Sequence, residues 1–131
     1  MRKLLLALLM CCWLMPARAE WKLIDFNDGE AIYLNDFFRP GGDTTRMWML
    51  IDYREPTSQG SLSVKLLWEV DCPARAVRTL RYSSHPHRMG IGDAMKVDET
   101  PGEWARPPED SPQETIFVLV CRFDPNAGPK T

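Results

Sequence analysis

The sequence predicts an α+β fold, with about six short strands followed by one C-terminal helix. Three observations support this prediction. Turn-forming residues recur at short intervals, residues 61–72 alternate between apolar and polar side chains, and a helix-capping sequence begins at Ser111. Frequent turns favour short strands, and alternation places successive side chains on opposite faces of a strand.

Residues 1–19 predict a cleaved secretion signal peptide. Arg2 and Lys3 precede an apolar run from Leu4 to Leu14, and Ala17-Arg18-Ala19 forms a small-x-small cleavage site. The run is too short and wrongly flanked for a membrane anchor, so no transmembrane segment is expected. Residues 20–131 have the size of a single domain, exported to the periplasm or the outer cell surface.

Charge and cysteine usage agree with export. The signal peptide removes three of the 16 basic residues and none of the 18 acidic ones, which leaves a mildly acidic chain that should not bind nucleic acid. Cys11 and Cys12 lie inside the apolar run without a small residue before them, so we expect them to leave with the signal. Cys72 and Cys121 then remain, and an oxidising compartment predicts a disulfide between them.

The expected strands span residues 21–26, 30–35, 46–53, 61–72, 77–83 and, more weakly, 94–97. Asn27-Asp28-Gly29 ends the first, and a turn at residues 39–43 precedes the third. The fourth strand has the clearest pattern. Its apolar positions, expected to cover a core, are Leu62, Val64, Leu66, Trp68 and Val70. The alternate positions, expected to face water, are Ser61, Ser63, Lys65, Leu67 and Glu69. Cys72 is in phase with the apolar set.

The last segment fits either a buried strand or a helix. Residues 116–120 are apolar and mostly β-branched or aromatic, which suits a strand. The preceding Ser111-Pro112-Gln113-Glu114 is a capping box, in which Glu114 would reach back to the Ser111 amide, and it favours a helix after an extended, proline-rich connector at 100–112. The apolar residues of such a helix would share one face: Ile116, Leu119, Val120 and Phe123. The disulfide would then clamp this helix onto the sheet.

A basic stretch without acids offers weak candidates for partner binding: Arg75, Arg78, Arg81 and Arg88. It could bind sulfated glycans or acidic loops, or it could be ordinary solvated strand edges. By strand parity, Arg75 and Arg81 share a face and Arg78 lies on the other. Trp104 could be an exposed anchor for a partner or could pack over a core edge.

Catalytic and metal-binding patterns are weak. His85-Pro86-His87 could supply two ligands, but no third residue is required by the spacing, and a polar loop explains the pattern. Ser83 stands beside His85 without a nucleophile-elbow motif. We therefore expect no catalytic residue, no metal and no cofactor.

Several segments resemble, in order, the surface-adhesin protein E family of Gram-negative bacteria. They are Met47 to Leu50 with Asp52-Tyr53, Ser61 to Lys65, Glu69 to Cys72, Arg78 to Tyr82, Met89 to Gly92, Trp104, Pro108 to Ser111, and Cys121. The resemblance implies an antiparallel sheet of about six strands with a C-terminal helix tied to it by the two cysteines. It also implies an exported, non-catalytic protein that binds host extracellular-matrix factors.

Two functions follow as hypotheses. The first is an exported binding protein whose partner is a protein or glycan outside the cytoplasm. The alternative is a periplasmic structural or assembly protein of the cell envelope, possibly a homodimer paired through an exposed strand.

Overall fold

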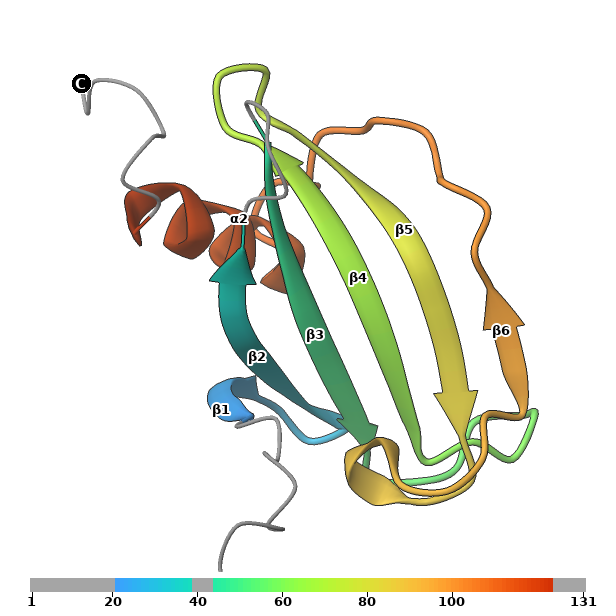
Figure 1. Cartoon of the computed structure of the whole chain (residues 1–131). Helices are drawn as coiled ribbons and strands as arrows, with labels where there is room; N and C mark the ends of the chain where they lie inside the picture. Colours follow the sequence, from blue (N-terminus) through green and yellow to red (C-terminus); the bar gives the residue numbers. More distant parts are fainter. Residues whose placement is uncertain (1–20, 39–43, 124–131) are drawn as a thin grey trace, which may run out of the picture.

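Six strands form one antiparallel sheet in the order β1-β2-β3-β4-β5-β6, so each strand pairs with its neighbour in the sequence. The computed structural model describes residues 21–38 and 44–123; the predicted signal peptide with Cys11 and Cys12, and the predicted turn at 39–43, lie outside them. The strands are β1 (Lys22–Phe26), β2 (Glu30–Phe38), β3 (Thr45–Tyr53), β4 (Ser63–Asp71), β5 (Ala76–His85) and β6 (Lys96–Asp98). A 3-10 turn, η2 (Arg88–Gly90), and the helix α2 (Pro112–Phe123) complete the α+β fold predicted from the sequence (Figure 1).

The helix α2 covers one face of the sheet near the ends of β2 and β3 (Figure 1). Alternate residues of β2, β3 and β4 point toward it because β-strand side chains alternate between faces. With the inner side of the helix they form the hydrophobic core, which consists of Ile32, Leu34, Met47, Met49, Trp68, Val70, Ile116, Phe117 and Val120. The helical interpretation of the last segment is therefore confirmed.

The N-terminus of α2 is capped nearly as predicted. The Ser111 hydroxyl accepts a hydrogen bond of 3.1 Å from the Glu114 amide. The reciprocal bond differs from the prediction, because Glu114 accepts from the Asp110 amide at 2.7 Å rather than from Ser111. Asp110 has a positive φ of 58°, and that backbone bend brings its amide to the Glu114 carboxylate.

The predicted disulfide between Cys72 and Cys121 is present. Cys72 follows the last residue of β4, and Cys121 lies in the last turn of α2, with 5.7 Å between their Cα atoms. Both cysteines pack against the hydrophobic core. The bond therefore fastens the end of the helix to the core side of the sheet, as the phase of Cys72 predicted.

The opposite face of the sheet, which we call the helix-free face, is not the solvated surface that the sequence predicted. Ser63 and Glu69 are buried, and so is Leu50 of the neighbouring strand. Ser63, Lys65 and Glu69 alternate along β4 with the residues that face the helix, so they point to the opposite face. Residues that pair across two strands share a face, and Leu50 pairs with Lys65. Residues 86–92, which include η2, fold back over Asp52 and Ser63 and exclude water there.

The chain after β6 continues along the edge of β5. Gly102 donates a hydrogen bond of 2.8 Å to the Thr79 carbonyl, and Val77 and Ala105 exchange two backbone hydrogen bonds of 2.9 and 3.0 Å. The proline-rich connector is therefore extended, as predicted, and it covers part of a sheet edge that would otherwise expose unpaired backbone groups.

Candidate functional site

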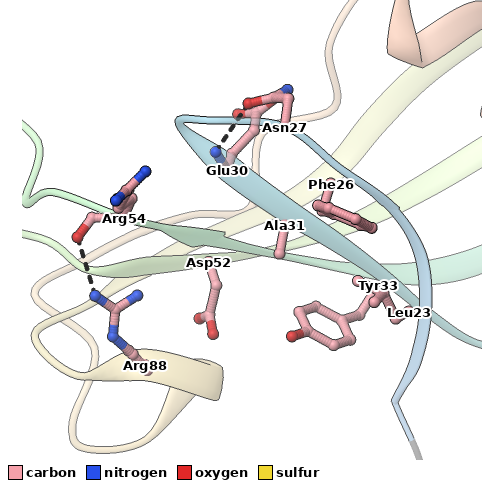
Figure 2. Close-up of a pocket in the computed structure, with 9 residues that line it drawn as sticks. All are labelled: Leu23, Phe26, Asn27, Glu30, Ala31, Tyr33, Asp52, Arg54 and Arg88. Atoms are coloured by element: carbon pink, nitrogen blue, oxygen red, sulfur yellow. Dashed lines mark hydrogen bonds between the residues drawn. The ribbon is translucent and has the colours of Figure 1, made fainter.

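An open groove of about 570 Å3 lies beside β1 on the helix-free face (Figure 2). Figure 2 shows the apolar and aromatic side chains of β1 and β2 on one side of it and Arg88 with Asp52 on the other. We call this hollow the β1 groove, and it is lined by Leu23, Phe26, Asn27, Glu30, Ala31, Tyr33, Asp52, Arg54 and Arg88. Leu23 is 52% exposed and Phe26 is 72% exposed. The groove thus combines an apolar surface open to solvent with a polar wall.

The turn between β1 and β2 fixes the position of Phe26. The Asn27 side-chain oxygen accepts hydrogen bonds from the amides of Gly29 and Glu30, at 2.8 and 3.0 Å, and the Asn27 amide donates to the Glu30 carbonyl. An asparagine whose side chain bonds to the backbone two residues further on is typical of tight turns. The pairing of β1 with β2 shifts by one residue between Leu23 and Asp25. Leu23 therefore pairs with Tyr33, and Phe26 pairs with Ala31.

The polar wall of the groove is held by η2. The Arg88 guanidinium donates hydrogen bonds to the backbone carbonyls of Tyr53 and Arg54, at 2.7 and 3.0 Å. The buried Asp52 carboxylate accepts a hydrogen bond of 2.7 Å from the Met89 amide. Met89 has a positive φ of 59°, an uncommon conformation for a residue with a side chain, and this hydrogen bond helps to maintain it. Contacts within the protein therefore hold the wall in place.

A buried polar cluster anchors the same segment beneath η2. The Ser63 hydroxyl donates to the His87 carbonyl at 2.5 Å and accepts from the Gly90 amide at 2.9 Å. His85 Nδ1 lies 3.0 Å from the Gly92 carbonyl, and Nε2 lies 2.9 Å from the Ser83 hydroxyl. Because a carbonyl oxygen only accepts, Nδ1 carries the hydrogen, and in the neutral ring Nε2 accepts from Ser83. Ser63 and His85 thus tie residues 86–92 to the sheet, and Ser83 orients the His85 ring.

A second group of polar side chains lies further along the helix-free face. Glu69 on β4 accepts hydrogen bonds from Arg46 on β3 at 3.1 Å and from Arg78 on β5 at 2.8 Å. Burial alone would raise the pKa of the Glu69 carboxyl, but the hydrogen bonds and positive charges of Arg78 and Arg46 outweigh it and lower that pKa. The Arg78 guanidinium also stacks over the Trp104 ring, 4.6 Å from its centroid. Trp104 therefore packs against the sheet edge while 41% of it stays exposed.

The parity prediction for the basic stretch is wrong. Leu67 pairs with Arg81 and Glu69 pairs with Arg78, and a register shift lies between these two pairs. Leu67 and Glu69 are two residues apart and share a face, so Arg78 and Arg81 share that face as well. The bulge adds one residue to β5 between Arg78 and Arg81, so the two side chains point to the same face although strict alternation predicts opposite faces. Arg81 pairs there with Glu99 at 2.8 Å.

The remaining residues of the basic stretch lie elsewhere. Arg75 occupies the turn between β4 and β5 with a positive φ of 53° and lines a small cleft of about 90 Å3 beside Phe117 of α2. Arg88 forms the wall of the β1 groove. The structure therefore distributes the four arginines over three places and adds Arg46, from a distant strand, to Arg78 and Arg81.

Of the residues that line the β1 groove, sequence reasoning named Arg88 as a candidate and missed the others. Leu23 and Phe26 fall in a predicted strand, but alternation alone does not tell which face of an edge strand a partner could cover. Asp52 and Arg88 gain their positions only when residues 86–92 fold back over β3, a contact between segments more than 30 residues apart. No local sequence pattern predicts that contact.

Residues 21–38 and 44–123 contain no group of three or more His, Cys, Asp or Glu side chains that could hold a metal ion. None of the helices in these ranges is long and apolar enough to cross a membrane.

A family model described as surface-adhesin protein E matches residues 21–122. The match covers every described strand, all but the last residue of α2 and both disulfide cysteines, and the chain therefore belongs to the surface-adhesin protein E family. The family indicates an adhesin-like protein that is exported or located at the cell surface. No curated protein and no solved structure matches the chain.

Proposed function

We propose that the mature chain, from Glu20 to Thr131, is a non-catalytic binding protein that holds a protein partner outside the cytoplasm through the β1 groove. The observation that carries this proposal is the pairing of two exposed apolar side chains, Leu23 and Phe26, with a polar wall already in place. Apolar side chains that gather on an exposed surface and are bordered by polar groups are typical of interaction sites.

The groove fits an apolar or aromatic side chain of the partner, flanked by polar residues. Phe26 and Leu23 would cover such an anchor, while Glu30 and Arg54 stand at the rim, where charge affects partner choice more than affinity. The family supports partners of the host extracellular matrix. Cleavage of a signal peptide after Ala19 is part of the proposal, and N-terminal sequencing of the exported protein should begin at Glu20.

Binding to immobilised matrix proteins tests the proposal. The double variant Leu23→Ala, Phe26→Ala should lose at least about tenfold in affinity, because aromatic anchors at interfaces commonly contribute 2 kcal/mol or more. Val118→Ala is the matched control, since Val118 is an exposed apolar residue of α2. An equal loss of affinity in the double variant and in Val118→Ala would overturn the proposal. So would a wild type that shows no saturable binding to any matrix protein.

The alternative function, an envelope assembly protein that forms a homodimer, is supported by one observation. Within the described sheet, β1 pairs on one side only, with β2. An edge strand of this kind can pair with a second copy. Sizing chromatography of the mature protein over a range of concentrations separates the two functions. A dimer that dissociates in the Phe26→Ala variant would assign the β1 groove to self-association.

A further inference from the structure

The helix-free face carries three cations around one buried carboxylate. The side chains of Arg46, Arg78 and Arg81 are 34%, 29% and 44% exposed, whereas that of Glu69 is 6% exposed. Glu69 is shared by Arg46 and Arg78, so the pair of arginines keeps one positive charge that this carboxylate does not balance. We call Arg46, Arg78 and Arg81 the arginine cluster.

The sheet fixes the spacing of the cluster. Arg46 and Arg78 lie on the two strands that flank Glu69 in β4, and adjacent strands are about 4.8 Å apart, which separates the two backbones by roughly 10 Å. Arg81 pairs with Leu67, one step along the same face, where Trp48 pairs with Leu67 from the other side. The shift in the β5 register is what brings Arg78 and Arg81 to one face.

We propose that the arginine cluster binds a sulfated polysaccharide. Sulfate groups accept bidentate hydrogen bonds from guanidinium groups, which are planar, always charged and weakly hydrated. Glu69 holds Arg46 and Arg78 in place before any ligand arrives, which reduces the conformational entropy lost on binding. Trp104, stacked under Arg78 and partly exposed, offers an apolar ring face at the border of the cluster for a sugar ring.

One feature favours a polysaccharide over an acidic peptide. An extended peptide usually requires a groove or a free strand edge for its backbone, whereas this surface is the face of paired central strands. The chain as a whole has a formal net charge of −2, so a polyanion of any kind should bind where cations gather rather than over the whole surface. The cluster shares no residue with the β1 groove, so the failure of one site leaves the other standing.

Heparin chromatography and calorimetry of the mature protein test the proposal. The wild type should be retained on heparin and released by salt, because contacts between exposed charges are screened. Arg81→Gln and Arg46→Gln should each weaken heparin binding roughly three- to tenfold, since each removes one charge-assisted contact. Arg75→Gln is the matched control, because it removes the same charge at the turn beside α2 and should leave heparin binding unchanged.

Arg81→Gln is the most informative variant because the ion-pair partner of Arg81 in the described part of the chain is the exposed Glu99, so this variant should retain its fold. An unchanged thermal midpoint would confirm this. Weaker binding of desulfated heparin supports the proposal. Absence of retention, equal losses in Arg75→Gln and Arg81→Gln, or displacement by polyglutamate as readily as by heparin would each overturn it.

Discussion

Glu69 and Arg78 face each other across β4 and β5, with 2.7 Å between Glu69 Oε1 and Arg78 Nη2. Arg46 reaches the second carboxylate oxygen from β3, so one buried acid links the three central strands on the helix-free face. A buried carboxylate is tolerated only where donors satisfy its oxygens, and here both oxygens have a guanidinium partner. The stability of this region therefore depends on the charge of a single group.

The first prediction is a pH dependence of stability that Glu69 controls. The folded-state pKa of Glu69 lies below its unfolded value because of Arg78 and Arg46, so its stabilising contribution is complete above the unfolded pKa. The contribution is lost as the pH falls through the folded pKa. Glu69→Gln should cost about 2 kcal/mol near neutral pH.

Urea unfolding across the acidic range measures this dependence. The gap in unfolding free energy between wild type and Glu69→Gln should narrow as the pH falls. Asp98, whose pKa is lowered by hydrogen bonds from Thr100, changes stability in the same direction, but it is present in both proteins and cancels in the comparison. A gap that stays constant with pH would contradict the assigned role of Glu69.

The second prediction concerns the disulfide. It closes a loop of 49 residues, for which the chain-entropy model gives about 4 kcal/mol. Reduction should therefore lower the thermal midpoint, and amides of α2 should lose hydrogen-exchange protection before those of β3 and β4. The matched comparison is the double variant Cys72→Ser, Cys121→Ser, which should be insensitive to reductant. An identical midpoint with and without reductant would count against a stabilising role.

The third prediction isolates the contact between Asp52 and η2. Asp52→Ala leaves the Met89 amide without its acceptor, and a buried unsatisfied group costs roughly 1–3 kcal/mol. We expect faster hydrogen exchange at Met89 and Gly90 and weaker binding in the β1 groove. Asp93→Ala, an exposed acid in the neighbouring loop, serves as control. Equal exchange rates in wild type and Asp52→Ala would show that this bond does not hold the wall.

The fourth prediction tests whether the helix-free face is a second buried surface. Leu50 is fully buried there, so Leu50→Ala should destabilise the protein by about 2–5 kcal/mol. Leu23→Ala, on the same face but half-exposed, should change stability by no more than about 0.5 kcal/mol. Chemical unfolding of the two variants decides the matter, and a small effect at Leu50 would mean that water reaches this face.

The strands, the helix and the disulfide could be predicted because each leaves a local signal. Alternation located β4, the cap at Ser111 located α2, and export with two remaining cysteines located the bond. The helix-free face could not be predicted, because its burial depends on residues 86–92 returning over Asp52 and Ser63. The pairing of Arg46 with Glu69 likewise joins residues 23 positions apart. The shared face of Arg78 and Arg81 depends on a bulge that alternation cannot reveal.

The strand order has a consequence for how the chain reaches this structure. Every strand pairs with the one made just before it, so the sheet can assemble by adding successive hairpins, without waiting for a remote segment. The contacts between distant parts of the chain come later, when residues 86–92 return over β3 and α2 docks on the sheet. Refolding should therefore show rapid formation of the sheet followed by a slower step in which α2 docks on it. Oxidation of the Cys72 and Cys121 thiols should be the last event.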